Sequence, residues 1–491
     1  MVKLYQLVSK LLHIYFILKV FFGANIMPFE FVDNTTIDRD ARRLIRSHVA
    51  KGKNVGKTHP SRKKRAIMKI ETARSSDRTR KEYCTYDMAN PTIEPQIGDS
   101  LSLTSLPIES TPGSRTLIRK ALSFLSRVAC LPGLGNVLEF GGPTPIWIRF
   151  LFLDQAYFHC SVAMCLAATD SMVVTPEESV EATYHLSNSL RLVNQKLSGE
   201  KALSDTTIAS VIAMLQYERL RGQYDQALIH FAGLQQMVEL CGGITKLAKN
   251  KPALAQKIFR ADLEIALYVG TSTQFDAKQV PGADTIDWLR QGLGEPQTHY
   301  LLRELHNLER PNDPLHDVFV DISSLAWFLN RNTENGIKLD VDRYQNAVIL
   351  IGYRLIHINP LSAPSLPNRF DNATYIGLLL FMASFLLSLS HRHPDLPILC
   401  KLTATLAHQN LTVTDDGEME DLLLWVLFLA GISVFRKMDP WLVQRTQQIV
   451  RSSHLRSWDE VRRVFSRRSL PWVDSVHGNP GQRLWAQLGH M

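Results

Sequence analysis

The stretch from Ser204 to Leu247, SDTTIASVIAMLQYERLRGQYDQALIHFAGLQQMVELCGGITKL, decides the fold class. Its apolar residues recur at helical spacing and form one stripe in the first half: Ile208, Val211, Ile212 and Leu215. Ser204 or Asp205 is placed to cap this first helix, and Gly222 marks its end. A second apolar run follows over residues 234–241. The stretch therefore predicts two consecutive helices.

Two glycines, Gly242 and Gly243, close the second apolar run. Many helices end in a left-handed backbone conformation, in which glycine has no side-chain penalty. We therefore expect this pair to cap a helix and pack against it rather than to form a binding site.

Helical spacing continues through the rest of the chain. Residues 315–329 carry another apolar stripe, and Ser457 to Glu460 form a capping box, S-x-x-E. Two almost wholly apolar segments, Ala373–Leu389 and Leu422–Phe435, fit buried helices better than membrane spans. No alternating run typical of a strand has comparable length. The sequence thus predicts an all-α fold, a large multi-helix domain over residues 115–491.

Charge is unevenly distributed along the 491 residues, whose 45% apolar and 21% charged content excludes collagen, coiled-coil and wholly disordered proteins. Residues 39–81 hold 16 Lys and Arg against three acidic residues, and residues 82–114 hold five acidic residues and no Lys or Arg. Residues 115–491 balance 36 basic against 36 acidic residues. Because a balanced domain does not attract phosphates over its whole surface, polyanion binding is expected in the N-terminal tail.

The tail, residues 27–81, is predicted to be basic and largely disordered. A short amphipathic helix begins near Asp38, and Arg42, Arg43 and Arg46 lie off its apolar face. A compact cluster follows that suits nuclear import receptors or DNA phosphates: Arg62, Lys63, Lys64 and Arg65. Residues 82–114 are rich in Pro, Ser and Thr and predict a flexible linker.

Residues 1–26 form an apolar leader interrupted by Lys10, His13 and Lys19. Such interruptions are unusual in a transmembrane helix, and no small-x-small cleavage site follows the leader. We expect translation to begin at Met27, with no membrane association. The alternative is a leader that is used as a membrane anchor or a secretory signal.

Catalytic and metal-binding motifs are not found in the sequence. The six cysteines lack the closely spaced C-x2-C pairs of a binuclear zinc cluster, and Cys160 and Cys165 are expected to be buried on one helix. H-E-x-x-H, G-x-S-x-G and G-x-G-x-x-G are absent. The sequence therefore predicts no enzyme activity, no metal and no cofactor.

The segment quoted first resembles the centre of the fungal-specific transcription factor domain, the helical region that accompanies zinc-cluster regulators in filamentous fungi. The residues that carry the resemblance are Ile208, Val211, His230, Phe231, Ala232, Gly233, Leu234, Met237, Gly242 and Gly243. The family usually has Arg before the two glycines, where this chain has Cys241. Tyr353–Ile356, the helix around Trp425, the segment SWDEVRRVF at 457–465, Trp472 and Trp485 are also similar to that family, so the resemblance spans about residues 115–490.

The front end, MPFEFVDN from Met27 and then ARRLIRSHVAKGKNVGK, is similar to a subgroup of these proteins without a zinc cluster. The resemblance implies a nuclear transcriptional regulator that contacts DNA non-specifically through its tail. The helical domain would then serve regulation, ligand sensing, self-association or contact with other regulatory proteins. The alternative is a helical interaction scaffold, or a corepressor-like protein, with no DNA binding.

Overall fold

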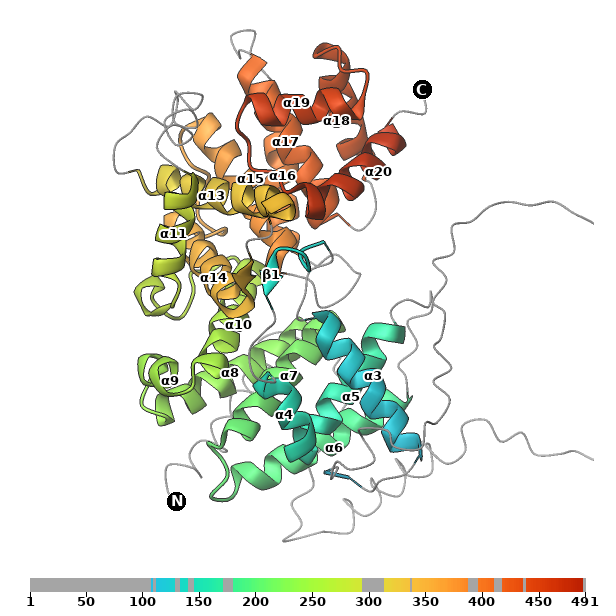
Figure 1. Cartoon of the computed structure of the whole chain (residues 1–491), viewed down its shortest axis with the longest axis vertical. Helices are drawn as coiled ribbons and strands as arrows, with labels where there is room; N and C mark the ends of the chain where they lie inside the picture. The colour runs from blue at the N-terminus through green and yellow to red at the C-terminus, as the bar shows by residue number, and fades with distance from the viewer. Residues whose placement is uncertain are drawn as a thin grey trace, which may run out of the picture. The chain divides into compact units, whose positions relative to one another are not determined.

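The protein is represented by a computed structural model that describes residues 107–108, 112–128, 133–139, 145–170, 180–293, 313–335, 338–386, 396–409, 417–435 and 439–488. The all-α fold is confirmed: these residues form 17 α-helices and only one pair of two-residue strands (Figure 1). The predicted leader, the basic tail with its amphipathic helix, and most of the linker lie outside the described residues.

The helices of the first half are α3 (Pro112–Val128), α4 (Ile146–Leu153), α5 (Gln155–Asp170), α6 (Val180–Leu197), α7 (Asp205–Leu220), α8 (Tyr224–Leu240), α9 (Ile244–Asn250), α10 (Pro252–Val269) and α11 (Ala283–Leu293). Those of the second half are α13 (Pro314–Asn335), α14 (Val341–Ile358), α15 (Arg369–Leu386), α16 (Pro397–His408), α17 (Gly417–Ser433), α18 (Pro440–Ser452), α19 (Trp458–Arg467) and α20 (Asn479–Leu488). A 3₁₀ turn, η1 (Ala277–Gln279), and a π-helical turn, η3 (Asp474–Gly478), complete the helical elements.

Helix α3 begins at Pro112, three residues before the predicted start of the helical domain. Proline suits this first helical position, because the missing N–H would have no partner within the helix. The two short strands, Leu138–Glu139 and Leu339–Asp340, pair in parallel and tie the segment after α3 to the start of α14. Periodicity could not reveal them, because two residues are too few to show alternation.

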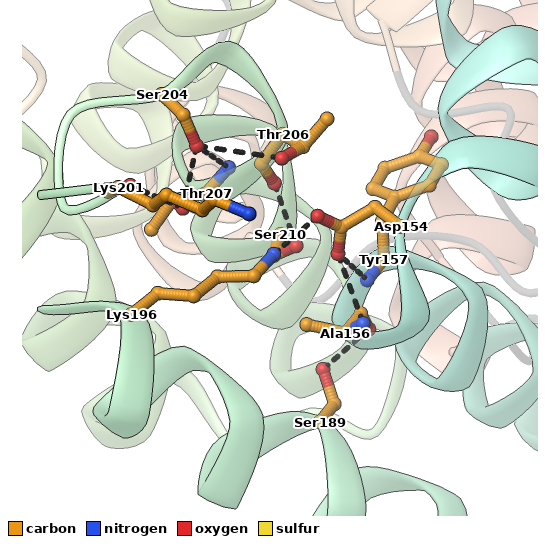
Figure 2. A network of polar contacts seen from close by, with 10 residues as sticks. All are labelled: Asp154, Ala156, Tyr157, Ser189, Lys196, Lys201, Ser204, Thr206, Thr207 and Ser210. Carbon is orange, nitrogen blue, oxygen red and sulfur yellow. Dashed lines mark hydrogen bonds and ion pairs between the residues drawn. The ribbon is translucent and has the colours of Figure 1, made fainter. Parts of the chain in front are cut away.

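Helices α5, α6 and α7 are joined by a polar network around Asp154 (Figure 2). The Asp154 carboxylate caps α5 by accepting hydrogen bonds from the backbone N–H groups of Ala156 (2.9 Å) and Tyr157 (3.1 Å), and it pairs with Lys196 of α6. Burial alone would raise the pKa of Asp154. The hydrogen bonds from Lys196, Thr206 and Tyr157 outweigh this effect, so the pKa falls below its usual value.

Ser204 is the residue that caps α7. Its Oγ accepts a hydrogen bond from the backbone N–H of Thr207 at 3.3 Å, and the helix begins at Asp205. Ser457 caps α19 in the same way through Glu460. The capping box there is incomplete, because the Glu460 carboxylate accepts from the backbone N–H of Arg456 (2.5 Å) and not from that of Ser457.

The two apolar segments form most of α15 and α17 as far as Leu386 and Ser433, and residues 387–389 lie outside the described residues. The two helices pack against each other, and most of their residues are buried. Gly377 of α15 allows the close approach, because a Cβ atom there would lie 2.0 Å from the Trp425 ring. Trp425 is fully buried, and its Nε1 donates to the backbone oxygen of Pro471 at 2.9 Å. These helices therefore form the centre of the C-terminal core.

No single helix among the described residues is both long and apolar enough to cross a membrane. The pair Ile146–Leu153 and Gln155–Ala168 has the required length and hydropathy only when the two helices are taken together, and they meet at 113°.

Candidate functional site

The basic residues that the sequence singles out for nuclear import and polyanion contact lie outside the described residues: Arg42, Arg43, Arg46, Arg62, Lys63, Lys64 and Arg65. The other predicted residues belong to α8 and its C-terminal end: His230, Gly233, Leu234, Gly242 and Gly243.

Gly242 and Gly243 end α8 in a Schellman motif. The N–H of Gly243 donates to the oxygen of Val238 and that of Gly242 donates to the oxygen of Glu239, both at 3.0 Å. Gly242 has φ +94°, and Gly243 has φ +90° with ψ 164°, a region that is essentially restricted to glycine. The two glycines thus set the turn that leads into α9.

The glycine pair also borders an open polar cleft of about 320 Å³ between the end of α8 and the loop that contains η1. Its walls carry the side chains of Glu239, Thr245 and Gln279, and the last two are hydrogen bonded to each other at 3.0 Å. No charged side chain inside this cleft is deeply buried. The cleft therefore has the character of a solvated surface.

His230 and Leu234 lie on one side of α8, four residues apart. Leu234 is fully buried, whereas the His230 Nε2 atom is 4.0 Å from a carboxylate oxygen of Glu218 on α7. Burial lowers the pKa of His230 to about 4, so the imidazole is neutral at pH 7. The 4.0 Å separation is too long for a hydrogen bond, and the neutral ring has no charge for binding anions.

Tyr353 and Arg354, which the sequence resemblance includes, connect α14 to two other helices. The Tyr353 hydroxyl donates to the buried Asp262 carboxylate of α10 at 2.6 Å. Asp262 also accepts from the backbone N–H groups of Gln274 and Phe275 and thereby holds the loop before η1. Burial raises the pKa of Asp262, and these hydrogen bonds oppose the increase.

Arg354 pairs with Asp321 of α13, a carboxylate that is completely buried. Arg354 Nη1 lies 2.9 Å from one oxygen of Asp321, and Arg290 Nε of α11 lies 2.5 Å from the other. Burial raises the pKa of Asp321, and the two guanidinium groups oppose the increase. One buried carboxylate therefore holds three helices together.

Two further buried carboxylates each pair with two arginines, as Asp321 does. Glu264 of α10 pairs with Arg219 of α7 and with Arg260 one helical turn away. Asp421 of α17 accepts from Arg467 (3.1 Å) and Arg468 (2.8 Å) at the end of α19. Some of the charged residues within 115–491 therefore pair with each other inside the fold.

A cavity of about 270 Å³ lies between α13, α19 and residues 469–474. Aromatic rings of Trp327, Phe465 and Trp472 line it, and the centroids of the last two rings are 5.1 Å apart. An ion pair between Arg462 and Asp474, 2.5 Å between nitrogen and oxygen, also borders the cavity. The cavity is open to solvent, and polar and apolar side chains both line it.

His477 holds the segment that forms one wall of this cavity. The backbone N–H of Val473 donates to His477 Nδ1 at 3.1 Å, so the proton of the neutral ring is on Nε2, which donates to Ser384 Oγ at 2.8 Å. Burial lowers the pKa of His477 to about 3. A protonated ring would carry hydrogens on both nitrogens and lose the bond to Val473.

Cys160 and Cys165 are both buried on α5. Burial raises the pKa of the Cys160 thiol, which makes it a poor nucleophile and metal ligand. Within the described residues no group of three or more His, Cys, Asp or Glu side chains is arranged to hold a metal ion.

Sequence reasoning missed the buried carboxylates and the cavity. Asp321 shows one local signal, because it interrupts the apolar stripe of residues 315–329 on its buried side. A charge at such a position is costly unless it is paired, so a partner could have been anticipated but not identified.

Comparison with known proteins gives one match. A family model described as the fungal specific transcription factor domain covers residues 103–467, from the segment before α3 to the end of α19. No curated protein and no solved structure matches the chain.

Proposed function

Because the chain belongs to the family of the fungal specific transcription factor domain, we propose that it is a transcriptional regulator that acts in the nucleus. The family match over residues 103–467 carries this proposal, since it includes all helices from α3 to α19. In this proposal the helical domain is the regulatory part of the protein.

Contact with DNA is assigned to the basic tail. Residues 39–81 hold 16 Lys and Arg against three acidic residues, and such side chains bind phosphates without reading bases. In the helical domain many arginines already pair with buried carboxylates, including Asp321, Glu264 and Asp421. We propose that the chain lacks its own zinc cluster and is brought to specific promoters by partner proteins.

Chromatin immunoprecipitation of the tagged full-length protein tests the regulatory role. Discrete promoter peaks are expected. The matched variant replaces Arg62, Lys63, Lys64 and Arg65 by Ala, and it should lose nuclear accumulation and the peaks together. Absence of peaks while the wild-type protein is nuclear would favour the interaction scaffold instead.

Electrophoretic mobility shifts with unrelated DNA duplexes test the role of the tail. If about six phosphates are neutralised, log K should fall against log salt with a slope near −5. The variant with Arg42, Arg43, Arg46 and Arg62–Arg65 replaced by Ala should lose most of this binding. Sequence-selective binding that persists in this variant would place DNA recognition in the helical domain and contradict the proposal.

A further inference from the structure

We propose that the open groove beside α19 binds an acidic, extended peptide segment of a partner protein. The groove has a volume of about 740 Å³ and follows residues 453–467, from the turn after α18 to the C-terminal end of α19. The inference goes beyond the proposed function and is independent of it, because peptide binding can be measured on the purified protein whether or not it regulates transcription.

The segment that forms the groove has a local excess of positive charge. Residues 440–488 hold eight Arg and no Lys against three acidic residues, although residues 115–491 as a whole are balanced. Three of these arginines line the groove: Arg456, Arg463 and Arg467. Cations that gather on one face attract anions to that face even when the domain is neutral overall. The groove therefore suits an acidic ligand.

The three arginines are accessible from solvent. Arg456 is exposed, and the side chains of Arg463 and Arg467 are 74% and 65% exposed. An anion can therefore reach their guanidinium groups without any rearrangement of the core. Guanidinium groups also match carboxylates well, because their planar fork can donate two parallel hydrogen bonds.

The carboxylates at the groove leave much of this donor capacity unused. Glu460 Oε1 lies 3.8 Å from Arg463 Nη2, too far for a hydrogen bond, and its other oxygen accepts from the backbone N–H of Arg456. Arg463 Nε donates to the backbone oxygen of Asp459 at 3.3 Å, so both of its Nη groups stay available. Asp421 is shared between Arg467 and Arg468. A ligand carboxylate can therefore bind without breaking a strong ion pair.

The spacing and the mixed lining of the groove favour a peptide over a nucleic acid. Arg463 and Arg467 are one helical turn apart, about 6 Å, and alternate side chains of an extended peptide are about 7 Å apart. Glu460 lies between Arg456 and Arg463 along the groove and would repel a continuous row of phosphates. A peptide can place an uncharged residue there, and the half-buried Leu455 offers it an apolar contact.

Photo-crosslinking with the full-length protein tests the proposal. The probe is a peptide of about ten residues with Glu at alternate positions, Leu between them and a central benzoylphenylalanine. Because the basic tail also attracts this probe, mass spectrometry locates the crosslinked residues. Crosslinks within residues 453–467 are expected in addition to those in the tail. The same peptide with Gln in place of Glu should give less than about a tenth of the groove crosslinks.

Two double variants place the binding in the groove. Arg456→Glu with Arg463→Glu should reduce the groove crosslinks at least about tenfold, because like charges then face each other. Arg191→Glu with Arg483→Glu is the matched control. It changes the net charge equally, at exposed positions on α6 and α20 that do not line the groove, and should leave the groove crosslinks unchanged. Crosslinks to the tail should stay the same in both variants.

Circular dichroism establishes that each variant is folded. If the double variant at positions 456 and 463 fails to fold, Arg463→Glu alone decides, with an expected reduction of about threefold. The proposal is overturned if the wild-type protein is crosslinked only in its tail, or if the groove crosslinks persist when these arginines are replaced.

Competition distinguishes a peptide surface from a nucleic-acid surface. An unrelated DNA duplex, added at the same concentration of negative charge, should displace the probe from the groove less than the unlabelled peptide does. Stronger displacement by the duplex would identify a nucleic-acid surface and overturn the proposal.

Discussion

Helices α15 and α17 are held together by apolar side chains, whereas α11, α13 and α14 share a buried carboxylate in addition to their apolar contacts. In the first pair the Trp425 ring packs on the bare backbone of Gly377. In the second group Asp321 joins Arg290 and Arg354. Apolar packing is roughly proportional to buried area and tolerates many arrangements. A buried charge demands a specific partner at a specific place.

The difference shows that the two parts of the core have different tasks. The α15–α17 pair supplies stability through area removed from water. The carboxylate clusters contribute less net stability, because desolvation offsets much of the attraction between charges. They penalise any helix arrangement that separates the partners. We therefore expect substitutions that change side-chain volume to destabilise the α15–α17 pair most. Substitutions that remove a charge should have their largest effect at the carboxylate clusters.

The largest effect is expected from Trp425→Ala. This change empties the centre of the α15–α17 packing and removes the hydrogen bond to Pro471, so the free energy of unfolding should fall by about 4 kcal/mol. Urea denaturation measures it. Trp288→Ala, at a side chain that is 39% exposed, is the control and should cost about 1 kcal/mol. Equal losses in the two variants would show that α15 and α17 are not the apolar centre.

Asp321→Asn tests the second region. The amide keeps the shape of the carboxylate but leaves Arg290 and Arg354 without their countercharge, and the expected loss is about 3 kcal/mol. Asp317→Asn is the matched control one helical turn away, where the side chain is 59% exposed, and it should change stability by less than about 0.5 kcal/mol. A loss below 1 kcal/mol for Asp321→Asn would mean that water reaches this cluster.

Tyr353→Phe sharpens the comparison, because it removes one hydroxyl without changing packing. Asp262 keeps the N–H groups of Gln274 and Phe275, so the expected loss in unfolding free energy is about 1.5 kcal/mol. Tyr184→Phe, at a side chain that is 62% exposed, should be close to neutral. If Tyr353→Phe and Tyr184→Phe lose the same free energy of unfolding, the hydrogen bond from Tyr353 to Asp262 does not contribute to stability.

The last effect concerns pH and is distributed over several histidines. His159 and His230 have pKa values lowered to about 4 and His477 to about 3, from an ordinary value of 6.5. The unfolded chain therefore binds more protons below pH 6.5, and stability should be full above that value and fall as pH decreases towards 4. Each histidine contributes at most about 1.4 kcal/mol per pH unit in this window.

Thermal unfolding at pH 7.5 and pH 5 measures this dependence. His477→Gln should reduce the decrease in Tm between the two pH values, because position 477 no longer takes up a proton on unfolding. His357→Gln, at an exposed position near the end of α14, is the control. An unchanged pH dependence in His477→Gln would show that His477 does not contribute.

The sequence by itself determined the helical elements and their ends. The stripe that begins at Ile208, the Ser204 cap and the Gly242–Gly243 terminus depend on residues within a few positions of one another, so local rules apply to them. The prediction that residues 373–389 and 422–435 are buried helices rests on composition alone, and α15 and α17 confirm it as far as Leu386 and Ser433.

Only the tertiary structure decided which charges meet and where a cavity remains. Asp321 is 31 residues from Arg290 and 33 residues from Arg354, and no local pattern selects these partners among 55 Lys and Arg. The cavity requires Trp327 and Trp472 to come from distant segments. The physical reason is that apolar periodicity states which face of a helix is buried, whereas the packing of whole helices determines which neighbour covers that face.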